Sequence, residues 1–387
     1  GRVVGDQLLL EVVKRLRQTL FETDTVTRVG ADEFIILLQK IHQADDVLEV
    51  ANKIFGVFKT PFLAGGHELH MTGSIGSSCF PLDGENPEEL LKNADTAKSH
   101  AKQHGRNTYK RYANVMNARA LEKMVLENHL RYAIDHDELR LHYQPQVDIR
   151  TGEVIGLEAL VRWEHPEWGM IPPMDFIPLA EETGLIIPLG KWVLRKACLQ
   201  SRTWQQEGLK PVRIAVNLSL GQLRDGNLLT TVTEILRETG LGGEHLELEL
   251  TESMIVKNVE EAAEILRELK HMGVRISLDD FGAGQSSLGY LKRLPIDTLK
   301  IDRMFVRDIP GDAEDSAIAQ AIIAMAQSLK LEVIAEGIET EAQLRFFRER
   351  QCYRIQGYIF SKPVPAEVCR QFLNGNDFSH HTGVFQD

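Results

Sequence analysis

The sequence predicts an α/β protein in which a (β/α)8 barrel of the TIM type follows a smaller α+β unit. Five short apolar runs in the second half of the chain each close on a polar residue, and the spacing between them leaves room for a helix and two loops. A (β/α) barrel brings the carboxyl ends of its strands together at one face. We therefore expect the polar ends to converge there. They are Asn217, Glu249, Asp279 with Asp280, Lys300 with Asp302, and Glu336.

Length and composition limit the class of protein. The chain has 387 residues, of which 43% are hydrophobic and 26% charged. These values are typical of a globular protein, and the length allows about two domains. No apolar run approaches the roughly 18 residues that cross a bilayer, and no secretory signal is visible. We expect no membrane segment in this chain.

Charge and cysteine content narrow the function further. The net charge of −12 argues against broad binding to a nucleic-acid polymer, which needs clustered Lys and Arg. A small anionic ligand stays open, because bound divalent cations reverse the sign of an acidic pocket. The four cysteines match no zinc or redox spacing. We expect them to be reduced, as in a cytoplasmic protein.

The first unit, residues 1–112, mixes helices and strands without the regularity of the barrel. We expect a helix over Asp6–Leu20, a pair of strands around Thr27 to Leu38, and a second helix after them. A strand over Leu69–Gly76 and a last helix over Pro87–His104 complete the unit. This order predicts a small α+β fold.

A connecting helix and the barrel follow. Apolar residues recur at helical spacing over residues 113–137, which predicts a helix between the two units. From there strands and helices alternate, as a parallel sheet with helical crossovers requires. We expect the barrel to occupy residues 138–380.

The first unit contains several short motifs that occur in a characteristic order along the chain. They are Arg28-Val29-Gly30-Ala31-Asp32-Glu33-Phe34, Ser74-Ile75-Gly76, Phe80-Pro81-Leu82-Asp83-Gly84, Ala94-Asp95-Thr96-Ala97 and the segment from Ala101 to Tyr109. On these residues the unit resembles a GGDEF domain, the diguanylate cyclase module. The resemblance implies a nucleotide site, with Asp6 and Glu33 as candidate contacts for GTP.

Three departures from the GGDEF pattern predict a truncated and silent cyclase domain. The chain opens past the family's first strand, which supplies an acidic metal ligand. Ala31 replaces a glycine where the backbone should approach the nucleotide closely, and its Cβ would crowd that approach. Phe21 stands where the family's inhibitory Arg-x-x-Asp site, ending here at Asp24, has its arginine.

The second unit carries a longer and nearly complete series of motifs. They are Glu158-Ala159-Leu160-Val161-Arg162-Trp163, the segment from Phe176 to Gly184, Val216-Asn217-Leu218-Ser219, Glu249-Leu250-Thr251-Glu252, the segment from Asp279 to Gly284, Leu299-Lys300-Ile301-Asp302, Ala335-Glu336-Gly337 and Gln356-Gly357-Tyr358. On these residues the unit resembles an EAL domain, the cyclic di-GMP phosphodiesterase module. The resemblance implies a (β/α) barrel with one strand reversed.

The resemblance also implies a two-metal site for Mg²⁺ or Mn²⁺, ions that favour carboxylate and amide oxygens. Glu158, Asn217, Glu249 and Asp279 would hold one cation, and Asp279, Asp280 and Glu336 the second. Two such cations activate a shared water and offset charge on the entering and leaving oxygens of a phosphoryl displacement.

The remaining roles surround that site. Lys300 would orient the water, and its protonation state beside two cations is left open. Glu252 would anchor the loop after Asp280. The phosphates and guanines of the ligand would contact Gln144, Arg162, Asp302 and Gln356. Within the loop, Ala283 and Gln285 depart from the family's threonine and aromatic residue, and we expect activity to survive the loss of one hydroxyl hydrogen bond, worth about 0.5–1.5 kcal/mol.

Simpler interpretations exist for each residue taken singly. Glu249 fits the polar face of an alternating strand, and Asp279-Asp280 fits a helix-capping turn. Lys300 alone would be expected in solvent, and Gln356-Gly357 fits a turn. Their joint occurrence in one order, each at a predicted strand end, favours the site. Three functions then compete: a cyclic di-GMP hydrolase first, a non-catalytic cyclic di-GMP receptor second, and a cyclase with a regulatory barrel third.

A homodimer is expected only by analogy with the family. The helix after the Asp280 loop offers Leu288, Leu291 and Leu294, whose spacing is more typical of core than of an interface.

Overall fold

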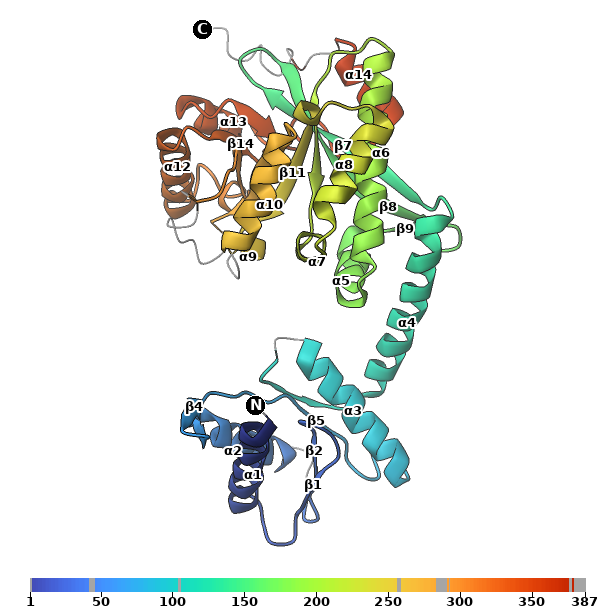
Figure 1. Ribbon diagram of the computed structural model, residues 1–387, viewed down its shortest axis with the longest axis vertical. Helices are drawn as coiled ribbons and strands as arrows, with labels where there is room; N and C mark the ends of the chain where they lie inside the picture. Colours follow the sequence, from blue (N-terminus) through green and yellow to red (C-terminus); the bar gives the residue numbers. More distant parts are fainter. Residues whose placement is uncertain are drawn as a thin grey trace. The chain divides into compact units, whose positions relative to one another are not determined.

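The computed structural model describes residues 2–41, 46–103, 106–255, 259–282, 291, 293–375 and 378, and the chain forms two compact units (Figure 1). They are Gly1–Val125 and Leu126–Asp387. The boundary falls within helix α4 (Asn114–Asp135), which occupies most of the segment predicted as a connecting helix. The domain limits predicted from the sequence stay a prediction. None of the described helices is both long enough and apolar enough to span a bilayer.

Before α4, the described residues of the first unit form three helices and three pairs of strands. These are α1 (Arg2–Thr19), β1 (Thr25–Arg28), β2 (Phe34–Leu37), α2 (Asp46–Lys59), β3 (Phe62–Ala64), β4 (His67–Leu69), β5 (Ile75–Ser77), α3 (Pro87–Gln103) and β6 (Tyr109–Arg111). The pairs β1–β2 and β3–β4 are antiparallel, and β5–β6 is parallel. Helix α1 buries Val12 and Leu16, one turn apart on a single face, against Ile54 and Phe62.

The strand predicted over Leu69–Gly76 is wrong. Leu69 ends β4 and pairs with Phe62, whereas Ile75 begins β5 and pairs with Tyr109. The tight turn at Gly65 and Gly66, with φ of 58° and 80°, fixes the β3–β4 hairpin, because two positive φ values are what a two-residue hairpin turn of type I′ requires.

The second unit is a closed eight-stranded barrel. Its strands are β7 (Leu139–Asp148), β8 (Glu153–His165), β10 (Arg213–Asn217), β11 (Leu246–Thr251), β12 (Arg275–Phe281), β13 (Thr298–Ile301), β14 (Glu332–Ala335) and β15 (Arg354–Gln356). Strands β8 and β10 to β15 are parallel, and β7 closes the barrel antiparallel to both β8 and β15. The prediction of a (β/α)8 barrel with one reversed strand is confirmed. Short strands β9 (Gly169–Ile171) and β16 (Val364–Pro365) extend the sheet outside the barrel.

Helices surround the barrel (Figure 1). They are α5 (Pro173–Thr183), α6 (Ile186–Gln206), α7 (Leu220–Arg224), α8 (Leu228–Thr239), α9 (Glu252–Ile255), α10 (Val259–His271), α12 (Ala313–Ser328), α13 (Glu341–Glu349) and α14 (Ala366–Leu373), with 3-10 turns η1 (Gly243–His245) and η2 (Arg303–Phe305). Their apolar faces pack on the outward side chains of the strands, such as Leu248 and Ile276, both fully buried. Leu291 and Leu294 are also buried, as core residues are, and Leu288 lies outside the described residues.

Strand ends agree with the sequence prediction only in part. Strand β10 ends at Asn217, and Glu336 directly follows β14. The prediction is wrong for Glu249, because β11 continues to Thr251, and for Asp279 and Asp280, because β12 continues to Phe281. A polar residue can lie inside a strand without ending it where the barrel interior supplies its partners.

Candidate functional site at the barrel mouth

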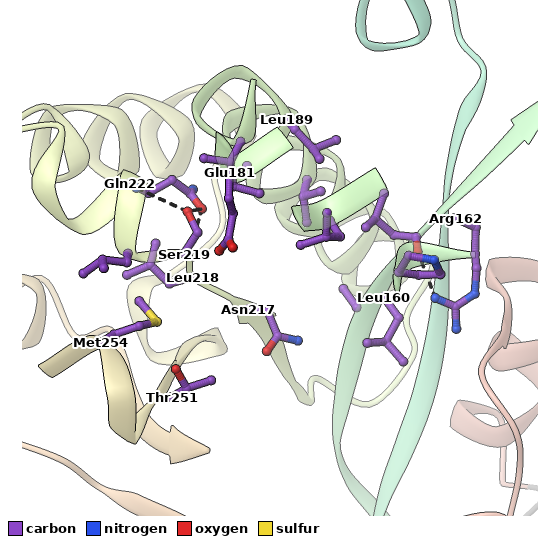
Figure 2. Close-up of a pocket in the computed structure, with 18 residues that line it drawn as sticks. Leu160, Arg162, Glu181, Leu189, Asn217, Leu218, Ser219, Gln222, Thr251 and Met254 are labelled. Carbon is purple, nitrogen blue, oxygen red and sulfur yellow. Dashed lines mark hydrogen bonds between the residues drawn. The ribbon is translucent and has the colours of Figure 1, made fainter. Parts of the chain in front are cut away.

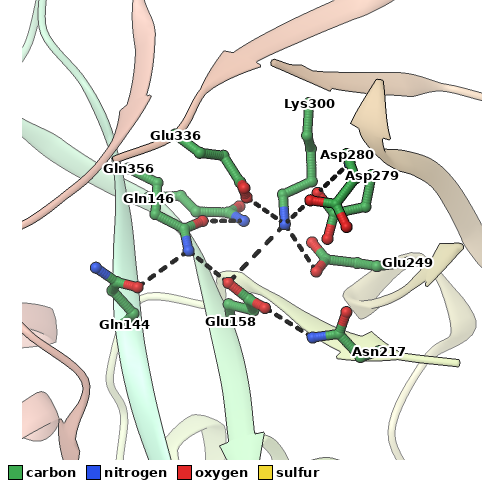
Figure 3. A network of polar contacts seen from close by, with 10 residues as sticks. All are labelled: Gln144, Gln146, Glu158, Asn217, Glu249, Asp279, Asp280, Lys300, Glu336 and Gln356. Atoms are coloured by element: carbon green, nitrogen blue, oxygen red, sulfur yellow. Dashed lines mark hydrogen bonds and ion pairs between the residues drawn. The ribbon is translucent and has the colours of Figure 1, made fainter. Parts of the chain in front are cut away.

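Side-chain alternation directs polar residues into the barrel. In a strand every second side chain points to the same face, so outward leucines of β11 alternate with inward Glu247 and Glu249. Both glutamates are only 1% exposed. The inward residues nearest the carboxyl ends of the strands form one layer, shown in Figure 3: Gln144, Glu158, Asn217, Glu249, Asp279, Lys300, Glu336 and Gln356.

Lys300 lies at the centre of this layer and is fully buried. Its Nζ is 2.5 Å from Glu336, 2.8 Å from Glu249, 3.5 Å from Asp279 and 3.9 Å from Glu158. Burial alone would lower the pKa of Lys300, but the four surrounding carboxylates outweigh it and raise that pKa well above its usual value. Lys300 is therefore a buried cation, and the expectation that a single lysine would lie in solvent is wrong.

The carboxylates outnumber the lysine, and their pKa values record the excess. Burial, followed by repulsion from neighbouring carboxylates, raises the pKa of Glu336 to about 8, although Lys300 lowers it. Burial and Asp279 raise the pKa of Asp280 to about 6. The pKa values of Glu249 and Asp279 are raised chiefly by burial. The layer thus holds more negative charge than Lys300 can neutralise.

Glu158 is the exception among these acids. Burial would raise its pKa, but attraction to Lys300 and hydrogen bonds from Gln356 and Asn217 lower it. Asn217 Nδ2 donates to Glu158 Oε1 at 2.7 Å, and Gln356 Nε2 donates to Glu158 Oε2. Each oxygen of this carboxylate is thus held by one amide donor.

An irregularity in β12 brings two consecutive acids to the same site. The pairing of β12 with β13 runs regularly to Leu278 and then shifts, so that Phe281 pairs with Ile301. Asp280 has φ of 53°, which is rare for a residue other than glycine. Such bulges redirect side chains and occur often beside active sites. The interpretation of Asp279-Asp280 as a helix-capping turn is therefore wrong.

The donor set fits a divalent cation. Asp279, Asp280 and Glu336 each offer an oxygen atom, and these atoms lie within 4.8 Å of one another. Glu249 Oε1 is buried without a hydrogen-bond partner among the described residues. Carboxylate and amide oxygens are the ligands that Mg²⁺ and Mn²⁺ prefer. A divalent cation would also favour the ionised form of these carboxylates, against the burial and mutual repulsion that raise their pKa values.

The other predicted residues lie around the layer. Arg162 borders a cavity of about 460 Å³, which Figure 2 shows with Asn217 and Glu181 also on its lining. Asp302 accepts a hydrogen bond from the Met304 amide and raises the pKa of Asp280 by repulsion, which places it near the layer.

Glu252 and the loop after β12 complete the surroundings of the site. Glu252, the first residue of α9, is 3% exposed and accepts a hydrogen bond of 3.4 Å from the Gly282 amide. That contact joins it to the first residue after Phe281, as an anchor of this loop would be. Ala283 and Gln285 lie outside the described residues.

Sequence reasoning missed two groups of residues. Gln146 on β7 is 1% exposed and donates from Nε2 to Gln356 Oε1 at 3.1 Å. At the amino ends of the strands, Glu332 accepts a hydrogen bond from Arg213 at 3.0 Å and forms ion pairs with Arg275, at 2.8 Å, and with Arg354. The period-two spacing of Gln144 and Gln146 was a usable signal, because both must face the same side of β7.

Comparisons with known proteins cover both units. Residues 127–363 match the family described as the EAL domain, and residues 1–108 match the family described as the diguanylate cyclase GGDEF domain. Over 367 residues the chain is 44% identical to the bifunctional diguanylate cyclase/cyclic di-GMP phosphodiesterase MucR of Pseudomonas aeruginosa, a match covering 95% of this chain and 53% of MucR.

A second curated relative and a solved structure agree. The cyclic di-GMP phosphodiesterase NbdA of Pseudomonas aeruginosa is 44% identical over 378 residues, covering 98% of this chain and 48% of NbdA. The chain thus spans about half the length of these relatives. A structure of the PaMucR phosphodiesterase in complex with c-di-GMP superimposes with a TM-score of 0.61 at 47% identity, covering 63% of this chain and 99% of that chain.

Proposed function

The chain belongs to the EAL domain family, with a GGDEF domain preceding the EAL domain, and from this we propose that its barrel hydrolyses cyclic di-GMP to the linear dinucleotide pGpG. The observation that carries the proposal is the layer of buried carboxylates around Lys300 at the barrel mouth. This is the chemistry that a metal-dependent phosphodiesterase needs, and it lies at the face where barrel enzymes bind their substrates.

We propose the following division of ligands. Glu158, Asn217, Glu249 and Asp279 would hold one Mg²⁺ or Mn²⁺ ion, and Asp279, Asp280 and Glu336 would hold the second. When bound, the two cations would supply a coordinated water of lowered pKa and would offset charge on the oxygens that enter and leave phosphorus. The close grouping of Asp279, Asp280 and Glu336 supports the second set.

Lys300 would then act as a hydrogen-bond donor. Because the four carboxylates raise its pKa well above the usual value, its ammonium group keeps its protons at neutral pH in the metal-free protein. As an ammonium group it can orient the attacking water and offset the negative charge that develops on the phosphoryl oxygens. Glu252 would support this arrangement from outside by holding the backbone after Asp280.

Substrate contacts would come from the rim of the layer. The planar guanidinium of Arg162 suits a phosphate, to which it can donate two parallel hydrogen bonds. Gln144, Gln356 and Asp302 offer amide and carboxylate groups for the remaining polar atoms of the ligand. The cavity beside Arg162 has apolar walls, including Leu189 and Met254, with Glu181 as a hydrogen-bond acceptor for the N–H groups of a guanine.

A hydrolysis assay tests the proposal. The chain is incubated with cyclic di-GMP and either Mg²⁺ or Mn²⁺, and pGpG is measured by chromatography. Glu158→Gln keeps the shape of the side chain but removes its charge, so we expect product from the wild type and little from the variant. An uncut dinucleotide with either metal would refute the hydrolase. If the wild type binds the ligand tightly in the presence of metal but forms no product, a receptor function is favoured instead.

We further propose that the first unit makes no cyclic di-GMP, although the name of the relative MucR includes a cyclase. Two features support this. Ala31 replaces a glycine where the backbone should approach the nucleotide, and Lys98 forms an ion pair of 2.7 Å with Glu33. Glu33 and Asp6 are the two residues proposed to contact GTP, so the carboxylate of one of them already has a partner. Incubation with GTP should yield no cyclic di-GMP. If saturating GTP leaves the hydrolysis rate unchanged, a regulatory nucleotide site in this unit is also excluded.

A further inference from the structure

The orientation of the Gln356 side chain matters for the site because an amide group is chemically asymmetric. Its Nε2 donates to Glu158 Oε2 and to Gln144 Oε1, the latter at 3.2 Å. If the amide turned over, its oxygen would face the Glu158 carboxylate, and two acceptors would then repel each other. The position of Glu158, a proposed metal ligand, thus depends on which end of Gln356 points toward it.

Two glutamines on β7 determine that orientation. Gln144 presents its oxygen to Gln356 and donates its own Nε2 to the Ser361 carbonyl at 3.2 Å, so a backbone group orients one end of the chain of amides. Gln146 approaches from the other side and donates Nε2 to Gln356 Oε1 at 3.1 Å. Figure 3 shows both glutamines directed at Gln356. Gln146 therefore supplies a donor that only the observed orientation of Gln356 can accept.

The neighbouring strand leaves space for Gln146. Gly156 on β8 lies opposite Gln146 in the sheet. A Cβ atom at Gly156 would lie 2.5 Å from Gln146 Oε1, which is far closer than van der Waals contact allows. The absence of a side chain at Gly156 is thus what lets the Gln146 amide occupy its place.

We propose that Gln146 is a positioning residue for the metal site: by fixing the orientation of Gln356, it holds Glu158 ready to bind a cation. This inference rests on the proposed function and goes beyond the residues that the sequence assigned to it. Gln146 is 1% exposed, so its effect on the reaction passes through Gln356. Partners of this kind typically change metal affinity or activity by about 10- to 100-fold when they are replaced.

The test replaces Gln146 by methionine, which has a similar length but no donor. In the full chain, we expect Gln146→Met to weaken Mn²⁺ binding in calorimetry by about tenfold or more and to lower kcat similarly, with KM little changed. Thr298→Val is the matched control, because Thr298 is fully buried in the barrel and its hydroxyl has no hydrogen-bond partner among the described residues. Mn²⁺ affinity within twofold of the wild type, or an equal loss in Thr298→Val, would overturn the proposal.

A second variant keeps the proposal testable if Gln146→Met fails to fold. Gly156→Ala should displace the Gln146 amide and weaken Mn²⁺ binding in the same direction. Where both variants fold, their effects should not add, because Gly156→Ala would have no amide left to displace. Unchanged Mn²⁺ affinity in Gly156→Ala, or additive losses in the double variant, would overturn the proposal. If the wild type binds Mn²⁺ but cuts no cyclic di-GMP, the proposed function fails, while the Mn²⁺ titrations still decide the role of Gln146.

Discussion

Replacing Glu336 by glutamine should make the metal-free protein more stable while it abolishes hydrolysis. Glu336 has 17% side-chain exposure and contacts Lys300 at 2.5 Å, yet burial and the neighbouring carboxylates raise its pKa from 4.5 to about 8. Since the folded pKa is the higher one, the folded state binds this proton more tightly than the unfolded chain does. The stability that the folded state gains by binding this proton is fully present below pH 4.5 and is lost as the pH rises toward 8.

The size of the effect follows from the two pKa values. A neutral glutamine resembles the protonated acid, so the variant avoids the penalty that the ionised acid incurs. With pKa values of 4.5 and about 8, linkage gives a gain of about 4 kcal/mol near pH 8 and about 1 kcal/mol near pH 5. Metal should narrow this gain near pH 8, because a cation at 100 times its dissociation constant stabilises the wild type by about 2.7 kcal/mol and the variant less.

Urea unfolding followed by tryptophan fluorescence measures this effect in the barrel alone. All four tryptophans, Trp163, Trp168, Trp192 and Trp204, lie in the second unit. The titration is run with EDTA near pH 5 and pH 8 and then with Mn²⁺. Glu264→Gln, on the exposed surface of α10, is the control and should change little. A Glu336→Gln chain no more stable than the wild type near pH 8, or equally stabilised at both pH values, would refute the reasoning.

Three further predictions test the same site. Lys300→Met should reduce hydrolysis by about 10²-fold or more, because the donor that offsets developing charge is removed. Mn²⁺ binding should stay equal or become tighter, because the lysine no longer competes for the carboxylates. Loss of Mn²⁺ binding in calorimetry would contradict this prediction. Mn²⁺ affinity should rise between about pH 6 and pH 8 and then level off. Asp280, with a pKa of about 6, and Glu336, with a pKa of about 8, must lose their protons to bind the ion. An affinity that does not change with pH would show that protons do not compete with Mn²⁺ for these carboxylates. Arg162→Lys should raise KM for cyclic di-GMP about tenfold at nearly constant kcat, because lysine cannot donate the paired hydrogen bonds of a guanidinium. A fall in kcat with KM unchanged would contradict the proposed role of Arg162 in binding the phosphate.

Most of the site could be found from the sequence because its residues are tied to strand ends. Asn217 closes β10 and Glu336 directly follows β14, and in a barrel the ends of successive strands meet at one face. This local rule brought Asn217, Lys300 and Glu336 to the same face without any structure, whereas Glu158 came from the resemblance to the EAL domain. The rule could not predict that Lys300 is a buried cation, because its charge depends on four carboxylates from other strands.

Features set by strand pairing could not be found in this way. The shift in register that directs both Asp279 and Asp280 to the site appears only when β12 pairs with β13. Similarly, the contribution of Gln146 depends on β7 running antiparallel between β8 and β15. In the first unit, the sequence predicted one strand over Leu69–Gly76. The hairpin turn at Gly65-Gly66 instead places Leu69 in β4, where it pairs with Phe62.

The sequence by itself determined the barrel and the polar residues that several of its strands bring to one face, because spacing and alternation are properties of neighbouring residues. Only the tertiary structure decided how those residues meet. Gln356 and Glu158 are 198 positions apart, and Lys300 and Glu249 are 51 apart, yet each pair is in contact. Contacts over such separations depend on the closure and stagger of the barrel, which arise from all eight strands together.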